Sequence, residues 1–134
     1  MDTDEQGEAI IIKFAQKQTP LVIHQMVEEW NFGSYPGFLA FVGNNPDTDK
    51  ATALLLYWKL APRFYCQYAD TQAALEAVPY AAKDIMLIET IERNYQGDFY
   101  HTQQFGFDPN QYWAKEYSDL PQVREIPTIM LTPL

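Results

Sequence analysis

Residues 50–60 read KATALLLYWKL, and their apolar side chains fall on nearly every side of a helix. A helix that is apolar all round is normally buried at the centre of a fold. Asp47 and Asp49 precede this segment, where a carboxylate can cap the first turn, and Pro62 follows it as a helix breaker. We therefore expect residues 50–60 to form a central buried helix.

Helical patterns flank this segment on both sides. After Thr19-Pro20, a typical helix start, apolar residues recur every three or four positions from Ile23 to Trp30. The isoleucines of residues 10–12 fit either a helix or a strand. The sequence predicts a mainly α fold, a compact bundle of about five to seven short helices around the central one. The other expected helices cover residues 9–18, 36–42, 71–78, 81–95 and 108–117.

The two ends of the sequence are expected to differ from this bundle. Residues 1–8 hold four acids and no base, which predicts a mobile acidic lead. Residues 124–134 contain Pro127 and Pro133, which predicts an extended tail, either a short edge strand or a strap on the core. Because no linker, repeat or low-complexity tract interrupts the sequence, residues 1–134 are expected to form a single helical domain.

The charge of the protein limits its expected partners. Eighteen acidic residues oppose nine basic ones, which gives a formal net charge of -9. Such a charge repels nucleic-acid phosphates and anionic membrane lipids, so neither is expected as a partner. A simpler interpretation is that the charge keeps the protein soluble. The single cysteine, the acidic N-terminal residues and the lack of a long apolar run predict a cytoplasmic protein.

The reactive side chains follow no catalytic or metal-binding motif. His24 and Glu28 are spaced to share one helix face, but a metal site needs further ligands. His101 has no evident partner for general-base catalysis, and the aromatic neighbours of Cys66 predict a buried thiol. Residues 44–49 have part of the spacing of a calcium loop, yet helix capping explains them better. We expect no metal, no cofactor and no enzymatic activity.

The aromatic residues exceed what a core of this size needs. The sequence has nine tyrosines, eight phenylalanines and three tryptophans, so some rings are expected at the surface. Tyrosine and tryptophan are favoured contact residues in protein interfaces, although rings that pack the edges of the core are an equal alternative. The expected partner-binding residues are Tyr35, Tyr65, Tyr68, Tyr100 and Tyr112 as anchors, with Glu28, Glu29, Glu89 and Glu92 as steering charges.

Three short motifs follow one another in the first half of the sequence. They are WNFG at residues 30–33, NPDTD at 45–49 and ATALLLYW at 51–58. Together they resemble the core of a bacterial domain family of unknown function, whose members are small, acidic and helical. The family pattern has a cysteine where this sequence has Thr48. The resemblance provides no catalytic residue, and it implies a link to the suspected immunity partners of secreted bacterial toxins.

Two functions follow from these observations. The first is a non-enzymatic protein-binding module, in the form of an immunity protein whose acidic surface docks a basic toxin or effector domain and neutralises it. The second is a small-ligand sensor or an enzyme whose site assembles from distant residues. Its reactive groups would be His24, Cys66 and His101.

Overall fold

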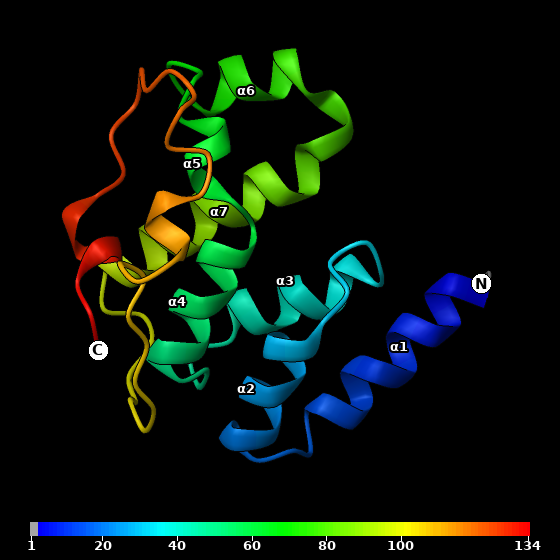
Figure 1. Cartoon of the computed structure of the whole chain (residues 1–134). Coiled ribbons are helices and arrows are strands. Elements are labelled where there is room, and N and C mark those ends of the chain that lie inside the picture. The colour runs from blue at the N-terminus through cyan, green and yellow to red at the C-terminus, as the bar shows by residue number, and fades with distance from the viewer. Residues whose placement is uncertain (1–2) are drawn as a thin grey trace.

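Helices account for all the regular secondary structure in the computed structural model, which describes residues 3–134 (Figure 1). The predicted mainly α fold is thereby confirmed, and the described residues form no strand. Seven α-helices and three short 3-10 helices follow one another within residues 3–134. The α-helices are α1 Thr3–Ala15, α2 Pro20–Glu29, α3 Pro36–Asn44, α4 Lys50–Lys59, α5 Pro62–Tyr65, α6 Thr71–Ala77 and α7 Ala82–Gln96. The 3-10 helices are η1 Pro79–Ala81, η2 Trp113–Lys115 and η3 Thr128–Leu131.

The helix α4 lies at the centre of the molecule, as the apolar pattern predicts. Every residue from Ala51 to Trp58 is buried. Its neighbours include α2, α3 and α7, which pack around it (Figure 1). The Asp49 side chain caps its first turn by accepting a hydrogen bond from the Ala51 backbone N–H at 2.9 Å. The central position of α4 means that most of the apolar burial in the fold is organised around this one helix.

Capping residues and prolines set where several helices begin. The Thr19 side chain accepts a hydrogen bond from the Val22 N–H, and Pro20 occupies the first turn of α2, as expected. Asp70 caps α6 in the same way, through a 2.8 Å bond from the Ala73 N–H. Pro36 opens α3. These local signals explain why the predicted starts of α2, α3, α4 and α6 agree closely with the structure.

The N-terminal segment differs from its expected form. Residues 3–8, expected as part of a mobile lead, are the first turns of α1, and the triple isoleucine is helical. Two contacts with the start of α3 account for this order. The Glu8 carboxylate accepts a hydrogen bond from the Gly37 N–H at 3.0 Å, and Gly7 lies close against the Tyr35 ring. Residues 1–2 of the expected lead lie outside the described residues.

The C-terminal segment, residues 97–134, wraps over the helices with little regular structure of its own (Figure 1). The helix expected over residues 108–117 is reduced to η2, and η3 interrupts the otherwise non-helical tail. Buried apolar side chains, among them Ile126 and Met130, and individual polar contacts hold this segment in place. The Trp58 indole N–H donates to the Met130 carbonyl at 2.8 Å, and the Arg63 guanidinium donates to the Leu120 carbonyl at 2.6 Å. The tail therefore serves as a strap on the core.

None of the helices within residues 3–134 combines the length and the apolar character that crossing a bilayer requires.

Candidate protein-binding surface

Four tyrosines from separate parts of the sequence gather around the end of α5. Tyr65 is half-buried there, and its ring stands edge-on to Phe64, with 5.1 Å between ring centroids. Phe64 in turn stands edge-on to Tyr117 at 5.4 Å. Tyr68 follows α5 and packs with Tyr65 against one small apolar cluster. Tyr80 lies in η1, near enough to Tyr65 to contribute to the raised pKa of its phenol, as Tyr68 and Tyr117 also do. We call Tyr65, Tyr68, Tyr80 and Tyr117 the tyrosine surface.

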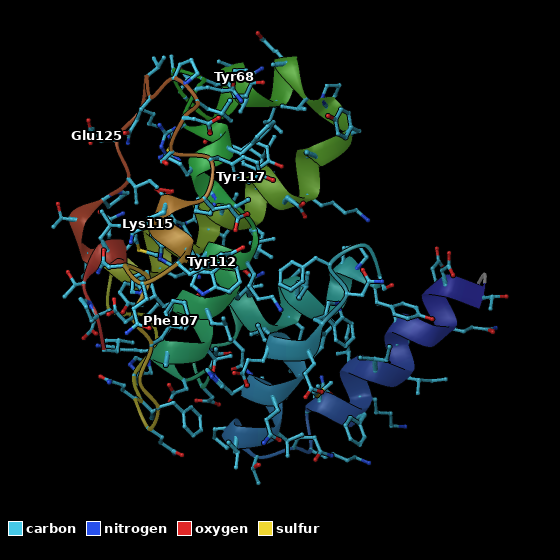
Figure 2. All side chains as sticks on the ribbon, in the orientation of Figure 1. Tyr68, Phe107, Tyr112, Lys115, Tyr117 and Glu125 are labelled. Atoms are coloured by element: carbon cyan, nitrogen blue, oxygen red, sulfur yellow. The ribbon has the colours of Figure 1, made fainter. Side chains whose placement is uncertain are left out.

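The tyrosine surface combines an ordered base with an exposed rim. Burial, followed by the nearby Asp84 carboxylate, raises the pKa of Tyr65 to about 12, so its phenol stays protonated at neutral pH. Tyr80 is 89% exposed and Tyr117 is 42% exposed. Figure 2 shows Tyr68 and Tyr117 at the end of the molecule that carries α5 and α6. Large exposed rings beside anchored ones are typical of a protein contact surface.

One carboxylate beside these rings lacks a compensating charge. Asp84 lies in the first turn of α7 and is half-buried. Burial raises its pKa. Within the described part of the chain, its carboxylate takes part in no hydrogen bond or ion pair. A half-buried, unpaired charge costs stability, and a cationic group on another molecule can offset that cost.

The expected anchors divide into different environments. Tyr65 and Tyr68 belong to the tyrosine surface, whereas Tyr112 is 63% exposed beside η2 and lies apart from Tyr68 in Figure 2. Tyr35 is half-buried against Gly7 of α1. The prediction of Tyr100 as a surface anchor is wrong, because this residue lies in the core. It is 1% exposed, and its hydroxyl donates a 2.6 Å hydrogen bond to a backbone carbonyl of α3.

The expected steering charges also lie in different environments, three at the surface and one in the interior. Glu28, Glu29 and Glu89 are exposed, as a steering role requires. The prediction of Glu92 as a surface steering charge is wrong, because this residue is only 7% exposed. Both of its oxygens accept hydrogen bonds from the Arg124 guanidinium, at 3.1 and 3.2 Å. The charge of Glu92 therefore fixes the C-terminal segment and does not face a partner.

Sequence reasoning missed Tyr80 and Tyr117 of the tyrosine surface, and Asp84 beside it. Tyr80 lies between two helices, immediately after Pro79, where no periodic pattern indicates which way a side chain faces. The helical pattern of residues 81–95 predicts that Asp84 faces solvent. Neither the burial of that carboxylate nor its nearness to Tyr65 has a signal in the sequence, because both depend on how α5 and α7 pack.

The three reactive side chains occupy separate surroundings. The Cys66 thiol is buried, donates to the Pro62 carbonyl at 3.4 Å, and has its pKa raised by burial. His24 shares a 2.8 Å hydrogen bond with Thr52, and His101 is exposed. No contact within the described residues joins any two of Cys66, His24 and His101. In that same part of the chain, no three His, Cys, Asp or Glu side chains are grouped so that they could hold a metal ion.

A polar hollow of about 250 Å³ lies between the end of α1 and the start of α4. Its most buried carboxylate, Asp49, accepts hydrogen bonds from the backbone N–H groups of Ala51 and Gln104. The Thr48 hydroxyl, on the same wall, donates to the Val42 carbonyl at 2.7 Å. The hydrogen-bonding groups of Asp49 and Thr48 are therefore already occupied within the protein. Their roles are to cap α4 and to link separate parts of the chain.

These features define an all-helical domain that carries an aromatic and acidic surface. The chain belongs to the DUF4274 family, a domain of unknown function, whose model matches residues 18–96. The matched region runs from the residues before α2 to the end of α7, so it contains Tyr65, Tyr68, Tyr80 and Asp84. No curated protein and no solved structure matches this chain.

Proposed function

We propose that this protein is a non-enzymatic protein-binding module that docks a basic partner protein through the tyrosine surface. The observation that carries the proposal is the gathering of four tyrosines beside Asp84, an unpaired half-buried carboxylate. Tyrosine offers a large rigid face and one polar atom, which suits the centre of an interface. A cationic side chain of the partner would relieve the cost of burying the Asp84 charge.

The charge of the whole protein supports a basic partner. A net charge of -9 attracts a positively charged surface over long range and accelerates its association. The exposed carboxylates Glu28, Glu29 and Glu89 contribute to this field. We propose that the partner is a toxin or effector domain and that this protein acts in the cytoplasm as its immunity protein, by covering the partner's working surface.

A capture experiment with matched variants tests the proposal. The purified protein is immobilised, a lysate of the source cells is passed over it, and retained proteins are quantified by mass spectrometry. The double variant Tyr80→Ala/Tyr117→Ala removes the two most exposed rings of the tyrosine surface. The single variant Tyr112→Ala removes an exposed ring elsewhere and is the control.

The expected result is one basic partner, retained in stoichiometric amount by the wild-type protein and by Tyr112→Ala. The double variant should bind that purified partner at least about tenfold more weakly. Raising the salt concentration should slow association, because charge steering is screened. The proposal fails if no basic partner is retained, or if Tyr112→Ala weakens binding as much as the double variant does.

A further inference from the structure

Three hollows meet at Pro36, between the N-terminal helices and the start of α7. They measure about 330, 300 and 400 Å³, and Pro36 lines all three. The first hollow has an apolar floor that includes Leu39, Met86 and Leu87. The third lies between the loop before α3 and the turn from η1 into α7, which face each other in Figure 1. We call the three hollows together the Pro36 groove.

The charged groups of the Pro36 groove are mostly acidic. Asp4, Glu8 and Asp84 line it against a single lysine, Lys83, which is exposed. The Glu8 carboxylate is already engaged by the Gly37 N–H. Asp84 lines two of the three hollows and, within residues 3–134, pairs with no cation. Lys83 lines the same two hollows as Asp84 but forms no ion pair with it, so the groove keeps an excess of negative charge.

The Pro36 groove is continuous with the tyrosine surface. Tyr80 and Ala81 line the third hollow, and Ala81 packs against the same small apolar cluster as Tyr65 and Tyr68. Asp84 likewise lines the groove, and its carboxylate contributes to the raised pKa of Tyr65. A partner that covers the tyrosine surface could therefore contact the groove as part of the same continuous interface. Met86, at the floor of the first hollow, is 48% exposed and offers apolar area for contact.

We propose that the Pro36 groove receives a short basic segment of the partner protein, with a lysine or arginine paired to Asp84 and an adjacent apolar side chain seated over Met86. This inference rests on the proposed function, because it assigns a second contact to the same docking event. The acidic walls select a cationic segment over a neutral one, since an unpaired carboxylate in the groove would otherwise be desolvated without compensation. The apolar floor selects a segment that is not uniformly charged.

Peptide selection on the full-length protein tests this inference. Random twelve-residue peptides displayed on phage are selected in parallel on the wild-type protein, on Asp84→Asn and on Glu76→Gln. The two variants lose the same single charge, but Glu76 is exposed on α6 and lines none of the three hollows. The comparison therefore separates a local pairing with Asp84 from a general effect of net charge.

Peptides enriched on the wild-type protein should contain lysine or arginine next to an apolar residue. The affinity of the best synthetic peptide should fall at least about tenfold on Asp84→Asn and stay within about twofold on Glu76→Gln. Amide chemical-shift changes on peptide addition should centre on residues 33–37 and 81–86. Failure to enrich any peptide, enrichment of peptides without basic residues, or equal binding to Asp84→Asn would each overturn the inference.

The two proposals fail separately. One outcome is that binding of the captured partner requires Tyr80 and Tyr117 but is as tight to Asp84→Asn as to the wild-type protein. The tyrosine surface is then the docking surface, and the proposed contact in the groove is wrong. If basic peptides depend on Asp84 while the tyrosine variants still retain the captured partner, the groove binds a basic segment and the proposed docking surface is wrong.

Discussion

The core and the two flanking segments of this protein are held together by different means. Around α4, stabilisation is spread over many apolar side chains, and every residue from Ala51 to Trp58 is buried. The flanking segments, residues 3–17 and 97–134, contribute fewer side chains to this packing, with Tyr100, Ile126 and Met130 buried in the same core, and specific bonds also tie them to other elements. Examples are the hydrogen bond of Glu8 with Gly37 and the ion pair of Arg124 with Glu92. A diffuse apolar core loses stability in proportion to the volume removed, whereas a specific bond that ties a flank to the core can be removed by one substitution.

The largest effect is expected in the core. Leu55→Asp places a carboxylate at a position that is 4% exposed in α4, where no cation can pair with it. The substitution should cost more than about 4 kcal/mol of unfolding free energy, enough to leave little folded protein. Circular dichroism at 222 nm and thermal melting measure this directly. A cooperative melt near that of the wild-type protein would show that α4 is not the centre of the fold.

The C-terminal flank should respond next most strongly. Arg124→Ala leaves the Glu92 carboxylate buried without its cation and should cost about 3 kcal/mol, measured by urea denaturation. Hydrogen exchange should rise most in residues 120–134, because the substitution removes the guanidinium that ties this segment to Glu92 of α7.

A double-variant cycle checks that explanation. Replacing Glu92 by Gln in the Arg124→Ala background removes the stranded charge, so the double variant should be more stable than the sum of the two single losses implies. Additive losses would mean that the ion pair contributes little and that packing holds the flank.

The N-terminal flank should give a smaller, local effect. Gly37→Ala introduces a Cβ that collides with the Glu8 carboxyl, so Glu8 must move and lose its bond with the backbone N–H of residue 37. We expect a loss of about 1 kcal/mol, offset in part by the better helix propensity of alanine. Proteolysis and hydrogen exchange in α1 should increase, while α4 stays protected. Gly33→Ala, where the nearest atom is 3.5 Å away, is the matched control.

The smallest effect, and the only stabilising one, is expected at Asp84. Its pKa is raised in the folded state, so the folded protein holds that proton more tightly than the unfolded chain does. At pH values below about 4 both states are protonated and the side chain costs nothing. As pH rises through the raised pKa, the cost of the buried charge develops fully and then stays constant.

Asp84→Asn should therefore be more stable than the wild-type protein by about 0.5 kcal/mol at neutral pH, and this difference should vanish in acid. The gain is small because a carboxylate in the first turn of α7 also interacts favourably with the helix dipole. Urea denaturation across pH 3 to 8 measures it. A variant that is less stable than the wild-type protein at neutral pH would show that the Asp84 charge is already compensated.

The comparison also explains which features the sequence predicts. The continuous apolar run of α4, the cap at Asp49 and the Thr19-Pro20 start are local signals, and the structure confirms them. The burial of Tyr100 and Glu92 is not local, because each is fixed by a partner on another element. Aromatic content indicates that some rings face outward, but which of them meet depends on the packing of α5, η1 and η2.

The hydrogen bond between the Trp58 indole and the Met130 carbonyl joins residues 72 positions apart. At ordinary rates of protein synthesis, about 5 to 20 residues per second, Met130 is synthesised roughly 4 to 14 seconds after Trp58. During this interval the helix that is most completely buried in the folded protein lacks part of its covering segment. Ribosome-bound chains of this protein should therefore depend on chaperones for longer than a domain of this size whose contacts are mostly close in sequence.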